Sequence, residues 1–188
     1  MRFRDDFEGV LSAAKTGAEW AIAALYRGFH PSVVRYFRTQ APAEGEDIAS
    51  EVWLDAAAAL GRFEGNEVAF RRWLFTIARR RLIDFRRREG RRRAVQGPAE
   101  AWGPSGAVDD PEARVLAASE TDAAVALLAS LPADQAEVVL LRVIAGLGVA
   151  DVAGIVGKKP GTVRVLQHRA LARLADELQR GRGKRVTQ

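Results

Sequence analysis

The sequence predicts an all-α protein of two small helical domains joined by a flexible, acidic linker rich in glycine and proline. Apolar residues recur three or four positions apart over most of the chain, which is the spacing of amphipathic helices. Residues 94–111 break this pattern with six Gly or Pro residues and no apolar periodicity. A length of 188 residues allows one domain or two small ones. We therefore expect one domain over residues 1–93, a linker over 94–111 and a second domain over 112–188.

The composition excludes several classes of protein. The chain has no cysteine, so it has no disulfide framework, no thiolate zinc site and no cysteine nucleophile, and a reducing compartment is expected. The amino-terminal residues lack the apolar segment of a signal peptide, and no apolar run approaches the roughly 18 residues that cross a bilayer. These features predict a cytoplasmic protein that does not bind a membrane.

Charge alternates along the chain in large blocks. The net charge is +5 overall, but it is −4 for residues 1–70, +9 for 71–93, −7 for 94–137 and +7 for 138–188. Two separated cationic surfaces indicate two contacts on a long polyanion such as DNA. Acidic and basic faces on flexibly joined domains can also occlude each other, so we expect the free chain to bind DNA weakly.

Three helices are expected in the first domain. Residues 19–38 carry an amphipathic apolar stripe, although Pro31 is expected to bend or interrupt this helix. The apolar spacing predicts a second helix over residues 46–60 and a third over residues 67 to about 88. The loop between them, residues 61–66, is marked by two glycines.

Four helices are expected in the second domain. Pro111 is placed to begin a helix that runs to about residue 130, where Leu131-Pro132 ends it. The apolar spacing then predicts three further helices, over residues 134–145, 150–156 and 160 to about 179.

Residues 149–166 have the spacing of a helix-turn-helix. Ala153 lies where the two helices would touch, and Gly157 lies four residues later at the turn, where glycine adopts a positive φ without steric cost. The outward face of the second helix then carries Gly161, Arg164, Val165 and His168. That face is available for the major groove of DNA. The alternative is a helical hairpin that packs and binds nothing.

The predicted helix that begins at residue 67 is rich in arginine. Residues 71–93 hold eleven arginines and only two acids. Arg72, Arg79 and Arg86 are seven residues apart, so a stripe of positive charge follows the helix at intervals of about 10 Å. Contact with nucleic acid is favoured over a solvated face, because a solvated face usually mixes charges of both signs. Arg81 points to the apolar side, and we expect it to pair with a carboxylate.

An acidic stripe lies on the helix before it. Asp47, Glu51 and Asp55 are spaced four residues apart, where like charges repel. Carboxylates suit the start of a helix, but that effect fades after the first turn and does not reach Asp55. The stripe therefore predicts a basic partner.

The sequence offers little for catalysis. It has no phosphate-binding loop, no His/Cys metal-ligand spacing and no Ser/His/Asp pattern, and its two histidines lie in different predicted domains. We expect no enzyme activity, no metal and no cofactor. Two other classes stay open: a helix-turn-helix regulator that binds DNA alone, which would leave the acidic stripe unused, and a DNA-acting enzyme such as a recombinase, whose nucleophile cannot be placed.

The two domains resemble regions of bacterial sigma factors. The second domain resembles region four through residues 131–135, 139–142, Gly146-Leu147, Val152-Ala153, 161–164 and 168–170. The first is similar to region two through residues 46–54, Phe63, 70–79 and Ile83-Asp84. The two regions in this order, joined by a linker, are the layout of the extracytoplasmic-function (ECF) group of the sigma-70 family.

The resemblance implies a dissociable subunit that binds core RNA polymerase, directs it to promoters and helps to open the DNA. The implied partners are the β′ clamp helices and β flap of the polymerase, promoter DNA and an anti-sigma factor. Polymerase binding is assigned to Asp47, Glu51 and Asp55. Binding and melting of the minus-ten element are assigned to Phe63, Asn66, Arg71, Arg72, Trp73, Arg79, Arg80 and Arg86. Binding of the minus-thirty-five element is assigned to Lys158, Lys159, Gly161, Thr162, Arg164, Val165, His168 and Arg169.

The second helix of the predicted helix-turn-helix, which begins at residue 160, and the two residues before it depart from the family pattern. Lys158 and Lys159 replace an apolar residue and the usual capping serine, and residues 164–167 are Arg-Val-Leu-Gln in place of Lys-Ser-Arg-Leu. The inward leucine is therefore shifted by one position. A promoter sequence cannot be copied from relatives onto this chain.

Overall fold

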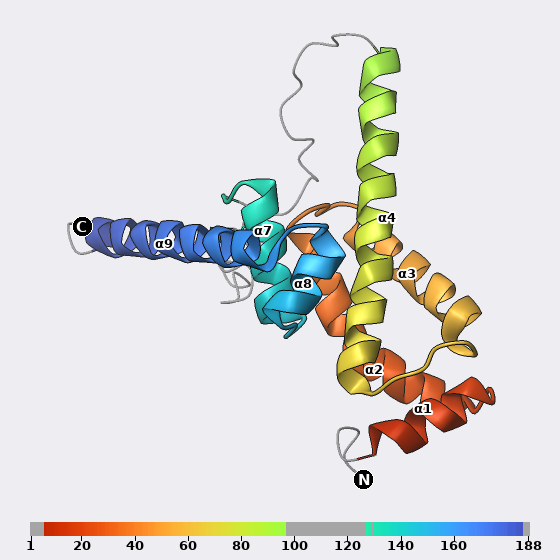
Figure 1. The fold of residues 1–188 in the computed structure, drawn as a ribbon. Coiled ribbons are helices and arrows are strands. Elements are labelled where there is room, and N and C mark those ends of the chain that lie inside the picture. Colours follow the sequence, from red (N-terminus) through yellow and green to blue (C-terminus); the bar gives the residue numbers. More distant parts are fainter. Residues whose placement is uncertain (1–5, 97–126, 129, 186–188) are drawn as a thin grey trace.

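The computed structural model describes residues 6–96, 127–128 and 130–185, and over these ranges the regular structure is entirely helical. This confirms the predicted all-α fold. In Figure 1 the other helices of the first domain lie around the lower part of the upright helix α4, whose upper part projects beyond them. The helices of the second domain lie beside them, with α9 projecting away. The predicted linker beyond residue 96 and most of the predicted helix over 111–130 lie outside the described residues.

The first domain contains four helices rather than the three expected. They are α1 (Phe7–Lys15), α2 (Glu19–Arg38), α3 (Gly45–Leu60) and α4 (Glu67–Gln96). The unexpected helix is α1, whose first turn is capped by Asp6, because the Asp6 carboxylate accepts a hydrogen bond from the Gly9 amide at 3.1 Å. Its apolar residues, spaced three and four apart, are buried against α2 and the start of α4.

Two predicted features of these helices need correction. Pro31 does not interrupt α2, which is continuous from Glu19 to Arg38. Phe29 and Val33 on either side of the proline are buried, so packing maintains the helix where one backbone hydrogen bond is missing. Helix α4 continues to Gln96 rather than to about residue 88, so the first three residues of the predicted linker are helical. An exposed ion pair at 3.1 Å between Arg92 and Glu89 lies on this extension.

The second domain contains α7 (Ala133–Val139), η1 (Leu140–Ile144), α8 (Val149–Val156) and α9 (Pro160–Arg185). The first two replace the single helix expected over 134–145, because the last turn is π-helical: the Ala145 amide donates to the carbonyl of Leu140 five residues earlier, at 3.1 Å. Helix α9 runs beyond the expected end near residue 179.

The turn of the helix-turn-helix has the predicted geometry. Gly157 ends α8 with φ 67° and ψ 33°, in the left-handed region that glycine adopts at little cost. The next amide, of Lys158, donates to the carbonyl of Ala153 at 3.0 Å. This closes α8 and directs the chain into α9.

The two domains pack together through one large hydrophobic cluster, and a smaller cluster lies within the second domain. Helix α4 packs on α2 and α3 within the first domain and on α8 of the second, while α2 also contacts η1. Buried residues from both domains, from Phe7 in α1 to Leu166 in α9, form one continuous cluster. The aromatic rings of Tyr36 and Phe75, whose centroids are 5.7 Å apart, lie within it.

The left-handed turn predicts a difference between two glycines of α8. A Cβ at Gly157 would meet no atom within 4 Å, so Gly157→Ala causes no steric clash with other residues. Alanine is nevertheless strained at a positive φ, and we expect this to destabilise the fold by about 1 kcal/mol. Gly154 also has open space but is helical, so Gly154→Ala should be neutral or stabilising by about 0.5–1 kcal/mol. Urea unfolding measures both, and equal effects would contradict the turn geometry.

Candidate nucleic-acid and polymerase interface

The amino-terminal half of α9 has an inward face and an outward face. Val163, Leu166 and Ala170 are buried against the rest of the second domain. The eight side chains assigned to the minus-thirty-five element are all exposed. Val165, on the same outward face as Arg164 and His168, is 49 % exposed. An amphipathic helix with a basic, solvent-exposed side is the form in which a protein reads the major groove.

Arg142 bonds to α9 and to the loop before α8, a contact that was not predicted. Its Nε donates to Oε1 of Gln167 at 3.1 Å, and its Nη1 donates to the carbonyl of Leu147. The guanidinium thus connects η1, the loop before α8, and α9. Leu166 is buried, as predicted from the one-position shift of the inward leucine. Gln167, which follows it, is half-buried and accepts the bond from Arg142. The departure at residues 164–167 was the only sequence signal for this contact.

The arginines of α4 do not all face solvent. Arg79 is half-buried, and its Nε donates to Oε1 of Glu137 on α7 at 2.9 Å. Arg72 is more exposed and pairs with Asp151 on α8 at 3.3 Å. Both were assigned to the minus-ten element, but in this structure each is paired with a carboxylate of the second domain.

The other assigned basic residues of α4 differ in their surroundings. Arg71 pairs with Glu67 one turn earlier, and its guanidinium lies over the Phe29 ring at 5.7 Å from the centroid. Arg86 donates to Oε1 of Gln40 at 2.6 Å. Arg80 is exposed. Arg80 and Arg86 therefore keep their charge at the surface.

Arg81 forms the expected bond to a carboxylate. Its Nε and Nη2 donate to the two oxygens of Asp55 on α3, at 2.6 Å for the first, and its Nη1 donates to Glu51 at 3.0 Å. The hydrogen bonds from Arg81 lower the pKa of Asp55. Nη2 of Arg88 also lies 3.8 Å from Oε2 of Glu51.

These contacts give two of the three acids of the stripe a basic partner within the same chain. Glu51 and Asp55 are half-buried and have basic partners within their own domain, whereas Asp47 is exposed. The repulsion between acids four residues apart is therefore offset by α4 of the same chain. Asp47 is the part of the stripe that is open to another protein.

The loop over residues 61–66 is held by its own side chains. Phe63 was assigned to the minus-ten element, but it is 8 % exposed and packs on Phe70 and Trp73, with ring centroids 5.4 and 5.0 Å away. The Oδ1 atom of Asn66 accepts from the Ala69 amide at 3.0 Å, which caps α4. The amide nitrogen of Asn66 is left as the donor that an exposed side chain can present.

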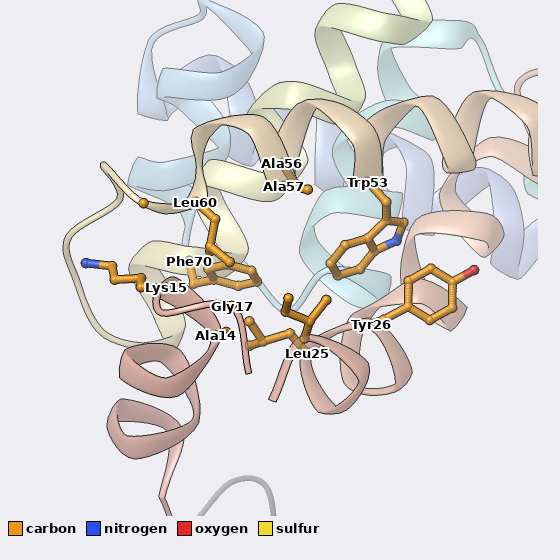
Figure 2. A pocket seen from close by; sticks show the side chains of 12 residues that line it. Ala14, Lys15, Gly17, Leu25, Tyr26, Trp53, Ala56, Ala57, Leu60 and Phe70 are labelled. Carbon is orange, nitrogen blue, oxygen red and sulfur yellow. The ribbon is translucent and has the colours of Figure 1, made fainter. Parts of the chain in front are cut away.

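Cavities lie between the helices of the first domain, and two of them adjoin α3. One of about 430 Å³ lies between α3 and α4, and it is lined by Asp55, Ala58, Ala59, Trp73, Ile77, Arg80, Arg81 and Asp84. The other, of about 330 Å³, lies between α1, α2 and α3 and is mainly apolar. Figure 2 shows Trp53 and Tyr26 at one end of the second cavity and Leu60 and Phe70 at the other. None of the assigned site residues lines the second cavity.

Within residues 6–96, 127–128 and 130–185, no three His, Cys, Asp or Glu side chains are grouped so that they could hold a metal ion. No helix in these ranges is long and apolar enough to cross a membrane.

Family models match both domains. The model of sigma-70 region 2 matches residues 25–92, and that of sigma-70 region 4 matches residues 121–174. The fold and its basic faces thus define a sigma-70-type initiation factor, a class of DNA-binding regulatory proteins.

Several relatives are similar over nearly the whole chain. The ECF sigma factor SigD of Mycobacterium tuberculosis is 35 % identical, over 91 % of this chain and 83 % of its own. ShbA of Streptomyces griseus, also an ECF sigma factor, is 35 % identical, over 91 % of this chain and 96 % of its own. The chain therefore belongs to the ECF group of RNA polymerase sigma factors. It binds core RNA polymerase and promoter DNA and directs transcription initiation, as predicted.

Solved structures show the same fold. CnrH in complex with the cytosolic domain of CnrY matches with a TM-score of 0.61 and 20 % identity, over 90 % of this chain and 95 % of that one. RpoE of Bartonella quintana in complex with the anti-sigma factor NepR matches with a TM-score of 0.62 and 24 % identity, over 82 % and 94 %.

The bond between Arg81 and Asp55 predicts a dependence of stability on pH. The pKa of Asp55 is lower in the folded state than in the unfolded state, where it is near 3.9. The ionised carboxylate therefore stabilises the fold fully above that unfolded-state pKa. This stabilisation is lost as the pH falls through the pKa of the folded state. We expect Asp55→Asn to lower the free energy of unfolding by about 1 kcal/mol at pH 7 and by less at pH 3. The effect is small because solvent partly screens a half-exposed ion pair. Urea unfolding at both pH values measures this. A cost that does not change with pH would contradict the assignment.

Proposed function

We propose that the two basic faces of this sigma factor divide the promoter between them. The observation that carries the proposal is the pair of surfaces described above: the exposed outward face of α9 and the arginine-rich face of α4, on separate domains. In this proposal residues 112–188 bind the minus-thirty-five element, residues 1–93 bind the polymerase and the minus-ten element, and residues 94–111 connect them.

In the upstream element, Arg164 and His168 read base edges. Both project from the outward face of α9, and Lys158, Lys159 and Arg169 are placed nearby for phosphates. The accessible amides of Gly161 and Thr162 at the start of the helix suit a further phosphate. Arg142 sets the position of this helix through Gln167, so it contributes to recognition without contacting DNA.

In the minus-ten element, an unpaired base enters the cavity between α3 and α4. Trp73 supplies an aromatic surface there and Arg80 supplies a cation at its edge. A base is extruded from the stack before a protein can enclose it, and this extrusion is part of opening the duplex. Phe63 then supports Trp73 from behind rather than stacking on the base itself.

Asp47 docks on core polymerase, with Glu51 and Asp55 contributing to the same negative surface. The β′ clamp helices are the proposed partner of this surface, and the β flap that of the second domain. An anti-sigma factor is a further proposed partner, on the ground of family membership. We also propose that the protein acts in the cytoplasm, where core polymerase transcribes, and that it has no catalytic activity of its own.

Run-off transcription from a promoter library, with core enzyme and with or without this protein, tests the proposal as a whole. Transcripts that depend on both components are expected. A helix-turn-helix regulator that acts alone would bind its sites but would not supply promoter selection to core enzyme.

The division of the promoter predicts opposite effects of two substitutions. Arg164→Ala should remove base contacts worth about 1–3 kcal/mol and relax selectivity at the upstream element, while strand opening is retained. Asn66→Ser should reduce strand opening while upstream selectivity is retained, because serine keeps the cap of α4 but lacks the amide donor. Footprinting and permanganate reactivity of minus-ten thymines, measured on the two holoenzymes, separate these effects.

Two results would contradict this division. One is an Arg164→Ala holoenzyme with unchanged upstream selectivity. The other is normal opening by both Asn66→Ser and Trp73→Ala, provided that circular-dichroism melts show both variants to be folded.

The proposed docking surface predicts that Asp47→Lys abolishes assembly with core polymerase without unfolding the domain. Asp47 is exposed, so charge reversal there breaks none of the contacts that Glu51 and Asp55 make with Arg81. Pull-down with core enzyme measures assembly, beside a circular-dichroism melt. Glu8→Lys, at an exposed acid on α1, makes the same charge change elsewhere. If core enzyme retains Asp47→Lys as well as it retains Glu8→Lys, the docking role of Asp47 is contradicted.

A further inference from the structure

Gln167 lies at the border between the inward and outward faces of α9. It is half-buried, between the buried Leu166 and the exposed His168. Residues three apart lie on the same side of a helix, so Gln167 stands about one turn beyond Arg164, which we assign to base edges. Gln167 belongs to none of the groups of residues assigned above to the promoter or to the polymerase. It is nevertheless placed at the edge of the surface that faces the major groove.

The side-chain amide of Gln167 has a defined orientation. Its Oε1 accepts from Nε of Arg142 at 3.1 Å. A guanidinium only donates hydrogen bonds, so the end of the amide that faces Arg142 must be the oxygen. Over the part of the chain that the structure describes, Nε2 of Gln167 has no hydrogen-bond acceptor, and it is not sealed from solvent. The amide therefore presents N–H donors that nothing within these residues uses.

Arg142 is itself anchored to a well-packed part of the second domain. It lies in the π-helical turn η1, and its Nη1 donates to the carbonyl of Leu147. Leu147 has no exposed surface, and its amide donates to the carbonyl of Leu141 at 3.1 Å, across Gly146 with φ 64°. Leu147 is thus held at both its amide and its carbonyl. Because this anchor fixes Arg142, the donors of Gln167 are oriented before a ligand arrives, and little side-chain entropy is lost on binding.

A glutamine in this state recognises only hydrogen-bond acceptors. A free glutamine reads adenine through one donor and one acceptor, but here Arg142 uses the acceptor. The bond from the cationic guanidinium also polarises the amide and strengthens its donors. The ligand that suits strengthened donors beside a positive charge is an anionic oxygen.

The edge position of Gln167 favours a phosphate of the DNA backbone as that ligand. Base edges form the floor of the major groove, opposite the middle of the outward face, where Val165 and His168 lie. Phosphates form the walls of the groove, and polar side chains at the border of a helix in the groove reach them. Gln167 therefore faces a wall rather than the floor.

We propose that Arg142 and Gln167 form a phosphate-binding site at the edge of α9, in which Gln167 donates to a phosphate oxygen while Arg142 orients and polarises its amide. This inference rests on the proposed function of α9 as the helix that binds the upstream element. The contact does not depend on base sequence, and it fixes how α9 lies in the groove. Gln167 touches the DNA, and Arg142 is a positioning residue.

Gln167→Glu separates a phosphate contact from a purely structural bond. A carboxylate still accepts from Arg142, and the two form an ion pair, so the fold keeps its stability. The variant has no donor, however, and its negative charge repels a phosphate. Gln179→Glu makes the same change in charge at an exposed glutamine about 18 Å further along the same helix, and it serves as the control.

The probe is a short fluorescein-labelled duplex of mixed sequence, because a phosphate contact does not depend on the bases. Fluorescence anisotropy measures its binding to the full chain at about 50 mM salt, where contacts with phosphates are strong. We expect Gln167→Glu to bind about tenfold more weakly than the wild type, and Gln179→Glu to change affinity by less than about threefold. Equal losses in the two variants, with circular-dichroism melts that match the wild type, would overturn the proposal.

Nuclear magnetic resonance observes the same contact in the wild-type chain. The chain has six glutamines, so nitrogen-15 labelling of glutamine alone gives few side-chain amide signals, and Gln167→Met identifies the signal of Gln167. On addition of the duplex, the Gln167 amide protons should move downfield, as those of a donor to a phosphate do, while the Gln179 signal stays in place. Arg142→Lys should reduce this shift, because lysine lacks the fork that orients the amide.

Two results of this second measurement would overturn the proposal, even where Gln167→Glu melts early. One is a Gln167 signal that does not move at saturating duplex. The other is an undiminished shift in a folded Arg142→Lys chain.

A double variant of two assigned residues separates this inference from the proposed function. Lys158→Ala with Lys159→Ala removes two exposed lysines before α9 that the proposed function places on phosphates. If this variant binds the duplex as tightly as the wild type, the proposed function of α9 is refuted, and the inference fails with it. If it binds weakly but Gln167→Glu behaves like Gln179→Glu, the phosphate site of Gln167 alone is refuted.

Discussion

The burial of one side of α4 is the constraint on which the rest of the structure depends. Leu74, Ala78 and Leu82 have no exposed surface, and together they fix the rotation of the helix about its own axis. Once that rotation is fixed, the three arginines between Ala78 and Leu82 are distributed around the remaining sides. Arg81 is directed to α3, Arg79 to the second domain and Arg80 to solvent. One hydrophobic face thus decides which charges bind within the chain and which are free to bind DNA.

The prediction from sequence succeeds where the signal is local. The helix-turn-helix follows from apolar spacing and from a glycine whose left-handed backbone few other residues adopt, all within residues 149–166. Arg81 was expected to meet a carboxylate because its place on the helical wheel is on the apolar side, where an unpaired charge is costly. Both features depend on geometry inside one helix or between adjacent helices. The sequence specifies them without knowledge of the tertiary fold.

The sequence does not specify contacts between segments that are far apart. Arg79 and Glu137 are separated by 58 residues and lie in different domains, so neither apolar periodicity nor charge counting relates them. The same limit applies to Phe63: the sequence marks an aromatic residue in a loop, but only the fold shows that Phe70 and Trp73 enclose it. Helix α1 and the π-helical turn also went unassigned. The first is short, and the second differs from an α-helix by one hydrogen-bond register.

The two carboxylates at the contact between the domains, Asp151 and Glu137, differ in their surroundings. The pair of Arg72 with Asp151 lies near solvent, where salt screens it and where its contribution is small. The Glu137 side chain is only 10 % exposed and is held by two donors, so it is screened little, and its desolvation cost is recovered only while both donors stay in place. Loss of either donor leaves a charge buried without sufficient partners. The contact between the domains therefore tolerates loss of the exposed pair better than loss of either donor to Glu137, the Tyr36 hydroxyl or the Arg79 guanidinium.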